Sequence, residues 1–187
     1  VILPLERISK SFYKEDLIDV YLEFALKAPV IFISDFGDRV FPKDITFEYW
    51  MAHPIEGLSP SILHFKNHLS LLFPEVRIKG YLELRSVDAP PPQWQMVPAI
   101  FYTGLLYNDQ FLDKTLDLLL PMTSRLPVLM EESTFGLEST DIFDLSKSLM
   151  KLAIEGFSCL PDTFKSWAHV NLINEFYESY TLNRKTF

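Results

Sequence analysis

The segment NHLSLLFPEVRIKGYLELRSVD, residues 67–88, decides the fold that this sequence predicts. Pro74 ends a helical pattern that runs through residues 61–72, and from Val76 to Val87 apolar and polar residues alternate. Alternation with a period of two is typical of a half-buried β-strand. We therefore expect one strand over this stretch, with an apolar face that packs against the core and an ionic face.

The ionic face holds the residues that point to chemistry. Because successive side chains of a strand lie on opposite faces, one face would carry Arg77, Lys79, Tyr81, Glu83 and Arg85. At strand spacing Glu83 and Arg85 are about 7 Å apart, close enough to converge on one metal-phosphate complex. Divalent cations prefer carboxylate oxygens, and phosphates prefer a guanidinium fork. A solvated face with cross-strand ion pairs explains the same pattern, so both interpretations stay open.

Helical spacing predicts further elements around this strand. We expect helices over 15–27, 61–72, 96–107, 109–120, 141–157 and 164–180, and a β-hairpin over 30–41. Thr140 or Asp141 is the expected N-cap of the helix over 141–157. One apolar stripe of that helix would face the core, and its members are Ile142, Leu145, Leu149, Leu152, Ala153 and Gly156. The predicted class is α+β with a mainly helical C-terminal half.

Composition excludes several kinds of protein. The 187 residues are 48% hydrophobic and carry a net charge of −8, which argues against nucleic-acid binding through a general basic field. No apolar run approaches the ~20 residues that span a bilayer, so we expect no membrane span. The single cysteine, Cys159, excludes an intrachain disulfide and is expected to be buried. The cytoplasm is the expected compartment.

Two ordered motifs, residues 67–88 and PAIFYTGLLYN at 98–108, resemble the plant and bacterial glutamate-cysteine ligases. The family pattern runs approximately HL(T/S)xxFPEVRxKxYLExRxxD and then PAFxxGLLYD. The chain departs from the family's Gly-Gly-Pro-Trp segment at residues 89–94, where it reads APPPQW. The resemblance implies a glutamine-synthetase-like fold, in which the chain supplies part of a curved antiparallel sheet packed with a mainly helical C-terminal half.

The same resemblance implies an activity. It is ATP- and Mg²⁺-dependent ligation of the glutamate γ-carboxylate to the cysteine amine through an acyl phosphate, in glutathione biosynthesis. By similarity to the Glu-x-Arg unit of glutamine synthetase, Glu83 would hold the metal and Arg85 would be a catalytic residue facing the transferred phosphate. Arg77 would be a second catalytic residue that binds substrate carboxylate or ATP phosphate. His68, which opens the motif, would contact substrate or buttress the strand.

We expect residues 1–187 to form a single domain and to be incomplete, because the chain begins at Val1 and not at a methionine. The resemblance implies that this domain is the C-terminal portion of a longer ligase. The remaining metal ligands and much of the nucleotide site would then precede Val1, so the chain alone should be inactive. Expected partners are glutamate, cysteine and ATP, with oligomeric state left open. Two alternatives remain: another carboxylate-amine ligase of the superfamily, and a non-catalytic fragment or homologue that acts as a binding or dimerisation module.

Overall fold

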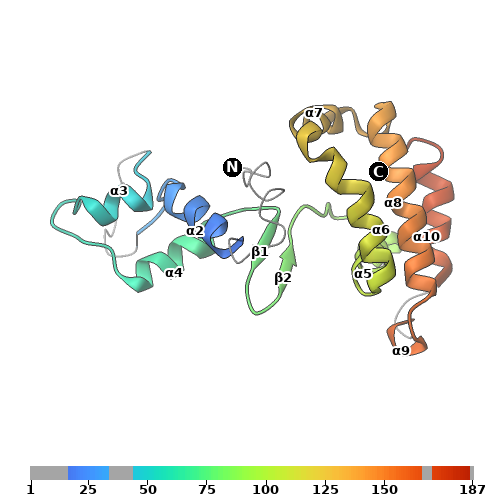
Figure 1. The fold of residues 1–187 in the computed structure, drawn as a ribbon, viewed down its shortest axis with the longest axis horizontal. Coiled ribbons are helices and arrows are strands. Elements are labelled where there is room, and N and C mark those ends of the chain that lie inside the picture. Colours follow the sequence, from blue (N-terminus) through green and yellow to red (C-terminus); the bar gives the residue numbers. More distant parts are fainter. Residues whose placement is uncertain (1–16, 34–43, 166–169, 186–187) are drawn as a thin grey trace. The chain divides into compact units, whose positions relative to one another are not determined.

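The computed structural model describes residues 17–33, 44–165 and 170–185. The chain divides into two compact units, Val1–Ser86 and Val87–Phe187 (Figure 1). The class is α+β, because helices dominate and the sheet found in the described residues has two antiparallel strands. The single domain and the curved glutamine-synthetase-like sheet stay predictions.

Three helices and a hairpin make up the described part of the first unit. In chain order they are α2 (Leu17–Lys27), α3 (Phe47–Ala52), α4 (Ile62–Leu71), β1 (Val76–Ile78) and β2 (Leu82–Leu84). Helices α2 and α4 confirm two of the predicted helices. The short helix α3 is missing from the prediction, because six residues give too little periodicity to identify a helix. Its N-cap is Thr46, whose hydroxyl accepts a hydrogen bond from the Tyr49 backbone N–H at 3.1 Å.

Apolar side chains of the three helices form the core of the first unit. Phe24, Ala25 and Ala28 of the α2 segment cluster with Leu72 at the end of α4. A second cluster gathers around α3, and it consists of Val30, Ile33, Phe47 and Trp50. Phe65 packs against both clusters, so it joins them into one apolar layer.

The hairpin predicted over 30–41 falls largely outside the described residues. Of its described part, Val30 donates a backbone hydrogen bond to the Ile45 carbonyl at 2.8 Å, and Pro29 forms an isolated antiparallel bridge with Thr46. Residues 31–33 are in neither strand nor helix. Residues 34–43, which hold the predicted turn, lie outside the described part of the chain.

The prediction of one strand from Val76 to Val87 is wrong, because the chain folds back into a hairpin. Strands β1 and β2 are antiparallel, with Arg77 opposite Glu83. The fold-back lets the Lys79 N–H donate to the Tyr81 carbonyl at 2.8 Å, a backbone bond that an isolated extended strand would leave unmade. A three-residue turn keeps odd-numbered residues opposite odd-numbered ones. The predicted ionic face therefore survives, distributed over two strands.

The second unit is helical. Its elements in chain order are η2 (Pro92–Trp94), α5 (Val97–Leu106), α6 (Asp109–Leu119), η3 (Leu120–Arg125), α7 (Leu126–Glu132), η4 (Ser133–Glu138), α8 (Thr140–Ser158), α9 (Asp162–Lys165), α10 (Val170–Phe176) and η5 (Tyr177–Thr181). Helices α5, α6 and α8 confirm the predicted ones. The described part of the helix predicted over 164–180 is helical, in α9, α10 and the π-helical turn η5. Residues 166–169, between α9 and α10, lie outside the described part.

Helices α5 and α8 form the centre of this unit, and they lie side by side in Figure 1. A Cβ atom added at Gly104 would overlap the carbonyl oxygen of Ala153, and one at Gly156 would overlap the carbonyl oxygen of Gly104. The two backbones therefore touch at these glycines. Around this contact lies a buried apolar cluster that includes Ile100, Met150 and Phe157.

Three details of α8 differ from the predictions. The N-cap is Ser139, not Thr140 or Asp141, and its hydroxyl accepts from the Ile142 N–H at 3.4 Å. Ala153 and Gly156 of the predicted stripe are buried, as expected. Met150 and Phe157 are buried beside them, so the stripe is rotated from the predicted one. Cys159, the C-cap residue of α8, is exposed and not buried as expected. Across the three described ranges, no helix is both long enough and apolar enough to cross a membrane.

Candidate functional site

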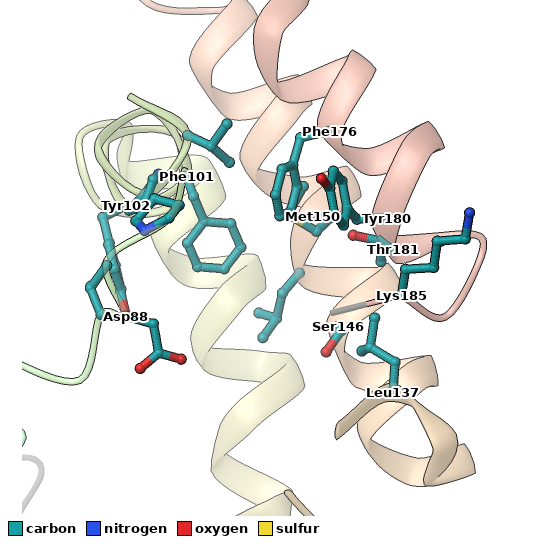
Figure 2. A pocket seen from close by; sticks show the side chains of 15 residues that line it. Asp88, Phe101, Tyr102, Leu137, Ser146, Met150, Phe176, Tyr180, Thr181 and Lys185 are labelled. Atoms are coloured by element: carbon teal, nitrogen blue, oxygen red, sulfur yellow. The ribbon is translucent and has the colours of Figure 1, made fainter. Parts of the chain in front are cut away.

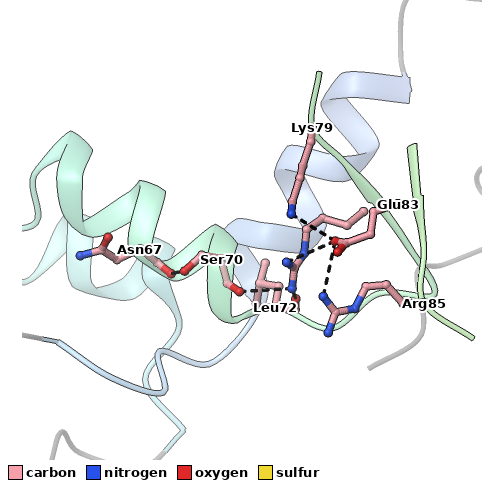
Figure 3. A network of polar contacts seen from close by, with 7 residues as sticks. Asn67, Ser70, Leu72, Lys79, Glu83 and Arg85 are labelled. Atoms are coloured by element: carbon pink, nitrogen blue, oxygen red, sulfur yellow. Dashed lines mark hydrogen bonds and ion pairs between the residues drawn. The ribbon is translucent and has the colours of Figure 1, made fainter. Parts of the chain in front are cut away.

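The hairpin of the first unit brings three cationic side chains around one carboxylate (Figure 3). Oε2 of Glu83 lies 3.3 Å from Nη1 of Arg77, its partner across the two strands. The same oxygen lies 3.5 Å from Nζ of Lys79 and 3.5 Å from Nη1 of Arg85. We call Arg77, Lys79, Glu83 and Arg85 the Glu83 cluster. The structure thus gathers the charged residues that the alternating pattern placed on one face.

Electrostatics of the Glu83 cluster favour an anion. Partial desolvation raises the pKa of the Glu83 carboxyl. The charges of Lys79, Arg77 and Arg85 together lower this pKa by more, so the net shift is downward. Glu83 is therefore ionised at neutral pH and cancels one of the three positive charges around it. The remaining positive charge can attract a phosphate or a carboxylate group.

Arg77 also ties the hairpin to helix α4. Its Nη2 donates to the carbonyl oxygens of Ser70 at 3.2 Å and Leu72 at 2.9 Å, at the C-terminal end of that helix (Figure 3). Terminal carbonyls of a helix have no partner within it, so a guanidinium that binds them stabilises the helix end. Only 12% of the Arg77 side chain is exposed. The Nη2 group of Arg77 is thus engaged by backbone carbonyls of the first unit. Contact between Arg77 and substrate stays a prediction.

Arg85 has fewer partners than Arg77. Besides the ion pair with Glu83, its guanidinium lies over the ring of Phe73, with Cζ 4.5 Å from the ring centroid. Among the described residues its side chain forms no hydrogen bond. The side chain is 23% exposed, so a bound anion could reach its N–H groups. Of the two arginines, Arg85 is the more available for a ligand.

His68 lies inside the first unit. Its side chain is 1% exposed, and its Nε2 donates to the carbonyl oxygen of Ala25 at 2.8 Å, which links α4 to α2. Burial lowers the pKa of His68, and the bond to Ala25 raises it by less. This position supports the alternative in which His68 buttresses the fold, and substrate contact stays a prediction. His64, four residues earlier, accepts the Ser61 backbone N–H through Nδ1 at 3.0 Å in a capping box.

A magnesium ion does not fit the described residues alone. Mg²⁺ is bound by several oxygen ligands in near-octahedral geometry. Within the ranges that the structure describes, no three His, Cys, Asp or Glu side chains gather into a metal-binding group. Glu83 contributes a single carboxylate, and three cations already surround it. The metal role of Glu83 therefore stays a prediction that requires ligands from elsewhere.

The second unit contains a separate cavity of about 380 Å³ (Figure 2). Four aromatic side chains line it. Phe101 and Tyr102 come from α5, and Phe176 and Tyr180 come from α10 and η5 near the C-terminal end of the sequence. Asp88 and Lys185 lie at its opposite sides in Figure 2. Trp94 does not line this cavity, and its ring instead contacts Phe176 and Tyr180 edge-on. Sequence analysis misses the cavity, because its walls come from segments far apart in the chain.

Comparison with known proteins identifies the family. The model of glutamate-cysteine ligase family 2 matches residues 4–143, which is most of the chain. The chain belongs to this family. The Glu83 cluster and His68 lie inside the matched range, whereas the α10 and η5 walls of the cavity lie beyond it.

Plant glutamate-cysteine ligases are among the proteins similar to this chain. A chloroplastic glutamate-cysteine ligase of Arabidopsis thaliana is 37% identical over 103 residues, which cover 52% of this chain and 19% of the relative. The Brassica juncea protein of the same name is 36% identical over 103 residues, with 52% and 20% covered. The Nicotiana tabacum protein is 30% identical over 147 residues, with 73% and 28% covered. The matched part of the chain thus spans 19–28% of the length of these relatives.

One residue of the site is missing from the sequence analysis. Phe73 is 67% exposed, and both Arg85 and Arg77 lie over its ring, the latter at 5.9 Å. The sequence does offer a signal for Phe73. It belongs to the family motif and lies between helix α4 and Pro74, outside the helical pattern that would bury it. Sequence analysis did not single out Phe73, because burial in a core is the usual role of a phenylalanine.

Proposed function

We propose that this chain supplies part of the active site of an ATP-dependent glutamate-cysteine ligase. One observation carries the proposal: three cations converge on Glu83 in residues that match the ligase family. An excess of positive charge beside a partly exposed guanidinium suits a triphosphate or an acyl phosphate. The curved sheet of the glutamine-synthetase-like fold, with strands from the rest of the protein, belongs to the same proposal.

The reaction that we propose has two steps. A γ-carboxylate oxygen of glutamate attacks the γ-phosphorus of ATP, which forms an acyl phosphate and releases ADP. The cysteine amine then attacks the acyl carbon, and the carbon–oxygen bond to phosphate breaks as the amide forms and a proton is lost. Both steps develop negative charge on phosphate oxygens, which preorganised cations stabilise.

In this proposal the members of the Glu83 cluster have separate roles. Arg85 binds the transferred phosphoryl group, because its N–H groups are the more accessible. Lys79 adds positive charge, and Arg77 fixes the hairpin while it offers its remaining N–H groups to substrate carboxylate or phosphate. Glu83 holds the cations in place and would supply one carboxylate to Mg²⁺, together with ligands outside the described residues.

The test uses the full-length protein with the upstream sequence included. Arg85→Ala and Glu83→Gln should each lower glutamate- and cysteine-dependent ADP release about 100-fold or more, the usual effect of removing a group that stabilises developing charge. Arg125→Ala is the matched control, because Arg125 is also an exposed arginine paired with one carboxylate, Asp141. Wild-type turnover in both cluster variants would rule out the site.

The same assay separates the alternatives. ADP release that responds to another amine but not to cysteine would favour a different carboxylate-amine ligase. No ADP release with any amine would favour a binding or dimerisation module. We expect residues 1–187 alone to release no ADP. The cytoplasmic location also stays a proposal, and the names of the relatives assign those proteins to chloroplasts.

A further inference from the structure

Phe73 is an exposed aromatic residue between two buried ones. The residues on either side of it, Leu72 and Pro74, are both buried, and Leu72 has an extended backbone conformation. Adjacent residues of an extended segment point to opposite sides, so burial of these two neighbours directs the Phe73 ring outward. Its ring face then lies under two guanidinium groups, those of Arg85 and Arg77.

The two arginines depend on this ring to different degrees. Arg77 keeps its bonds to Ser70 and Leu72 whatever happens at Phe73. Arg85 has only the ion pair with Glu83 and the ring among its described side-chain contacts. Three cations share the one carboxylate, and their mutual repulsion offsets part of the attraction of each to Glu83. The Phe73 ring is therefore an important second contact for the position of the Arg85 guanidinium.

We propose that Phe73 is a positioning residue for Arg85, an inference that rests on the proposed function. A guanidinium stacks on an aromatic ring through its flat face, which leaves the N–H groups at its edges free to bind phosphate oxygens. When a substrate or a metal draws Glu83 away from the cations, the ring still holds Arg85 in the same place. Phe73 thus keeps Arg85 preorganised throughout the reaction.

The experiment compares Phe73→Leu with Phe73→Tyr in the full-length enzyme. Leucine keeps an apolar side chain but removes the aromatic face, so kcat/KM for ATP should fall about tenfold, whereas tyrosine should restore it to within about twofold of wild type. Phe135→Leu is the matched control, because Phe135 is also 67% exposed and has no cation over its ring in the described contacts. It should leave kcat/KM unchanged.

A double-mutant cycle with Arg85→Lys measures the coupling between Phe73 and Arg85 in kcat/KM. A purely structural role of Phe73 would give no such coupling. If the ring acts through Arg85, Phe73→Leu should lower kcat/KM much less in the Arg85→Lys background than in the wild type. Equal losses in both backgrounds, or a Phe73→Tyr variant as impaired as Phe73→Leu, would overturn the proposal. Urea unfolding of each variant separates these outcomes from a general loss of stability.

The two proposals fail in different ways. If Arg85→Ala keeps wild-type activity, the proposed site is wrong and Phe73 has no catalytic group to position. If Arg85→Ala is inactive but Phe73→Leu matches wild type, the site stands and only the role of Phe73 is wrong.

Discussion

At the scale of single residues, two arginines of one hairpin have different environments. Arg77 binds Glu83 and two carbonyl groups at the end of α4, whereas Arg85 binds Glu83 and lies on the Phe73 ring. Their residue type and their place on the ionic face are the same, so the alternating pattern by itself does not distinguish them. The structure assigns Arg77 a larger share in stability.

Replacing Arg77 by alanine should therefore destabilise the chain more than replacing Arg85. Arg77→Ala leaves the Ser70 and Leu72 carbonyls without their donor and should lower the free energy of unfolding by about 1–3 kcal/mol. Arg85→Ala removes only a partly exposed ion pair and a ring contact, and should cost about 1 kcal/mol. Urea unfolding followed by circular dichroism measures both. Equal losses would contradict the division of roles between them.

His68 should make stability depend on pH. Its pKa is lowered in the folded state, so between the folded value and the ordinary value of 6.5 the unfolded chain binds more protons. The contribution of neutral His68 is fully present above pH 6.5 and is lost as the pH falls through the folded pKa. Urea midpoints measured from pH 8 to pH 5 test this.

His68→Gln is the matched variant for that measurement. Glutamine can still donate a hydrogen bond to the Ala25 carbonyl but does not titrate. The fall in stability below pH 6.5 should therefore be smaller in His68→Gln than in the wild type. An identical pH profile in the two proteins would show that another group is responsible.

At the scale of elements, helices were predictable and the hairpin was not. Helices α2, α4, α5, α6 and α8 follow from apolar residues three and four positions apart, which is a local pattern. Alternation of period two fits one long strand and a hairpin with an odd-numbered turn equally well. The choice between them depends on backbone hydrogen bonds across the turn, such as Lys79 N–H to Tyr81 O.

The contact between α5 and α8 gives the test at this scale. Gly104→Ala would place a methyl group against the backbone carbonyl of Ala153, which cannot rotate away as a side chain can. The helices must move apart, and we expect a loss of about 1–3 kcal/mol or more. Gly80→Ala is the control, because its added methyl group meets no atom within 4 Å. Thermal unfolding of both variants should show a large shift for the first alone.

At the scale of the whole molecule, the family is shown by comparison, whereas the activity of the Glu83 cluster is proposed. The family follows from the match over residues 4–143. The Glu83 cluster is complete within the first unit, yet its single carboxylate does not form a magnesium site with any other described residue. Since the matched part spans 19–28% of these relatives, the activity of a whole ligase stays a proposal for this chain.

The sequence by itself determined the α+β class, five helices and the residues of the ionic face, because each depends on spacing along the chain. Only the tertiary structure decided that Arg77 lies opposite Glu83, that Arg77 also caps α4, and that Phe73 lies beneath Arg85. These contacts depend on where the backbone turns and on which neighbours are buried. Residue spacing alone carries no information about either.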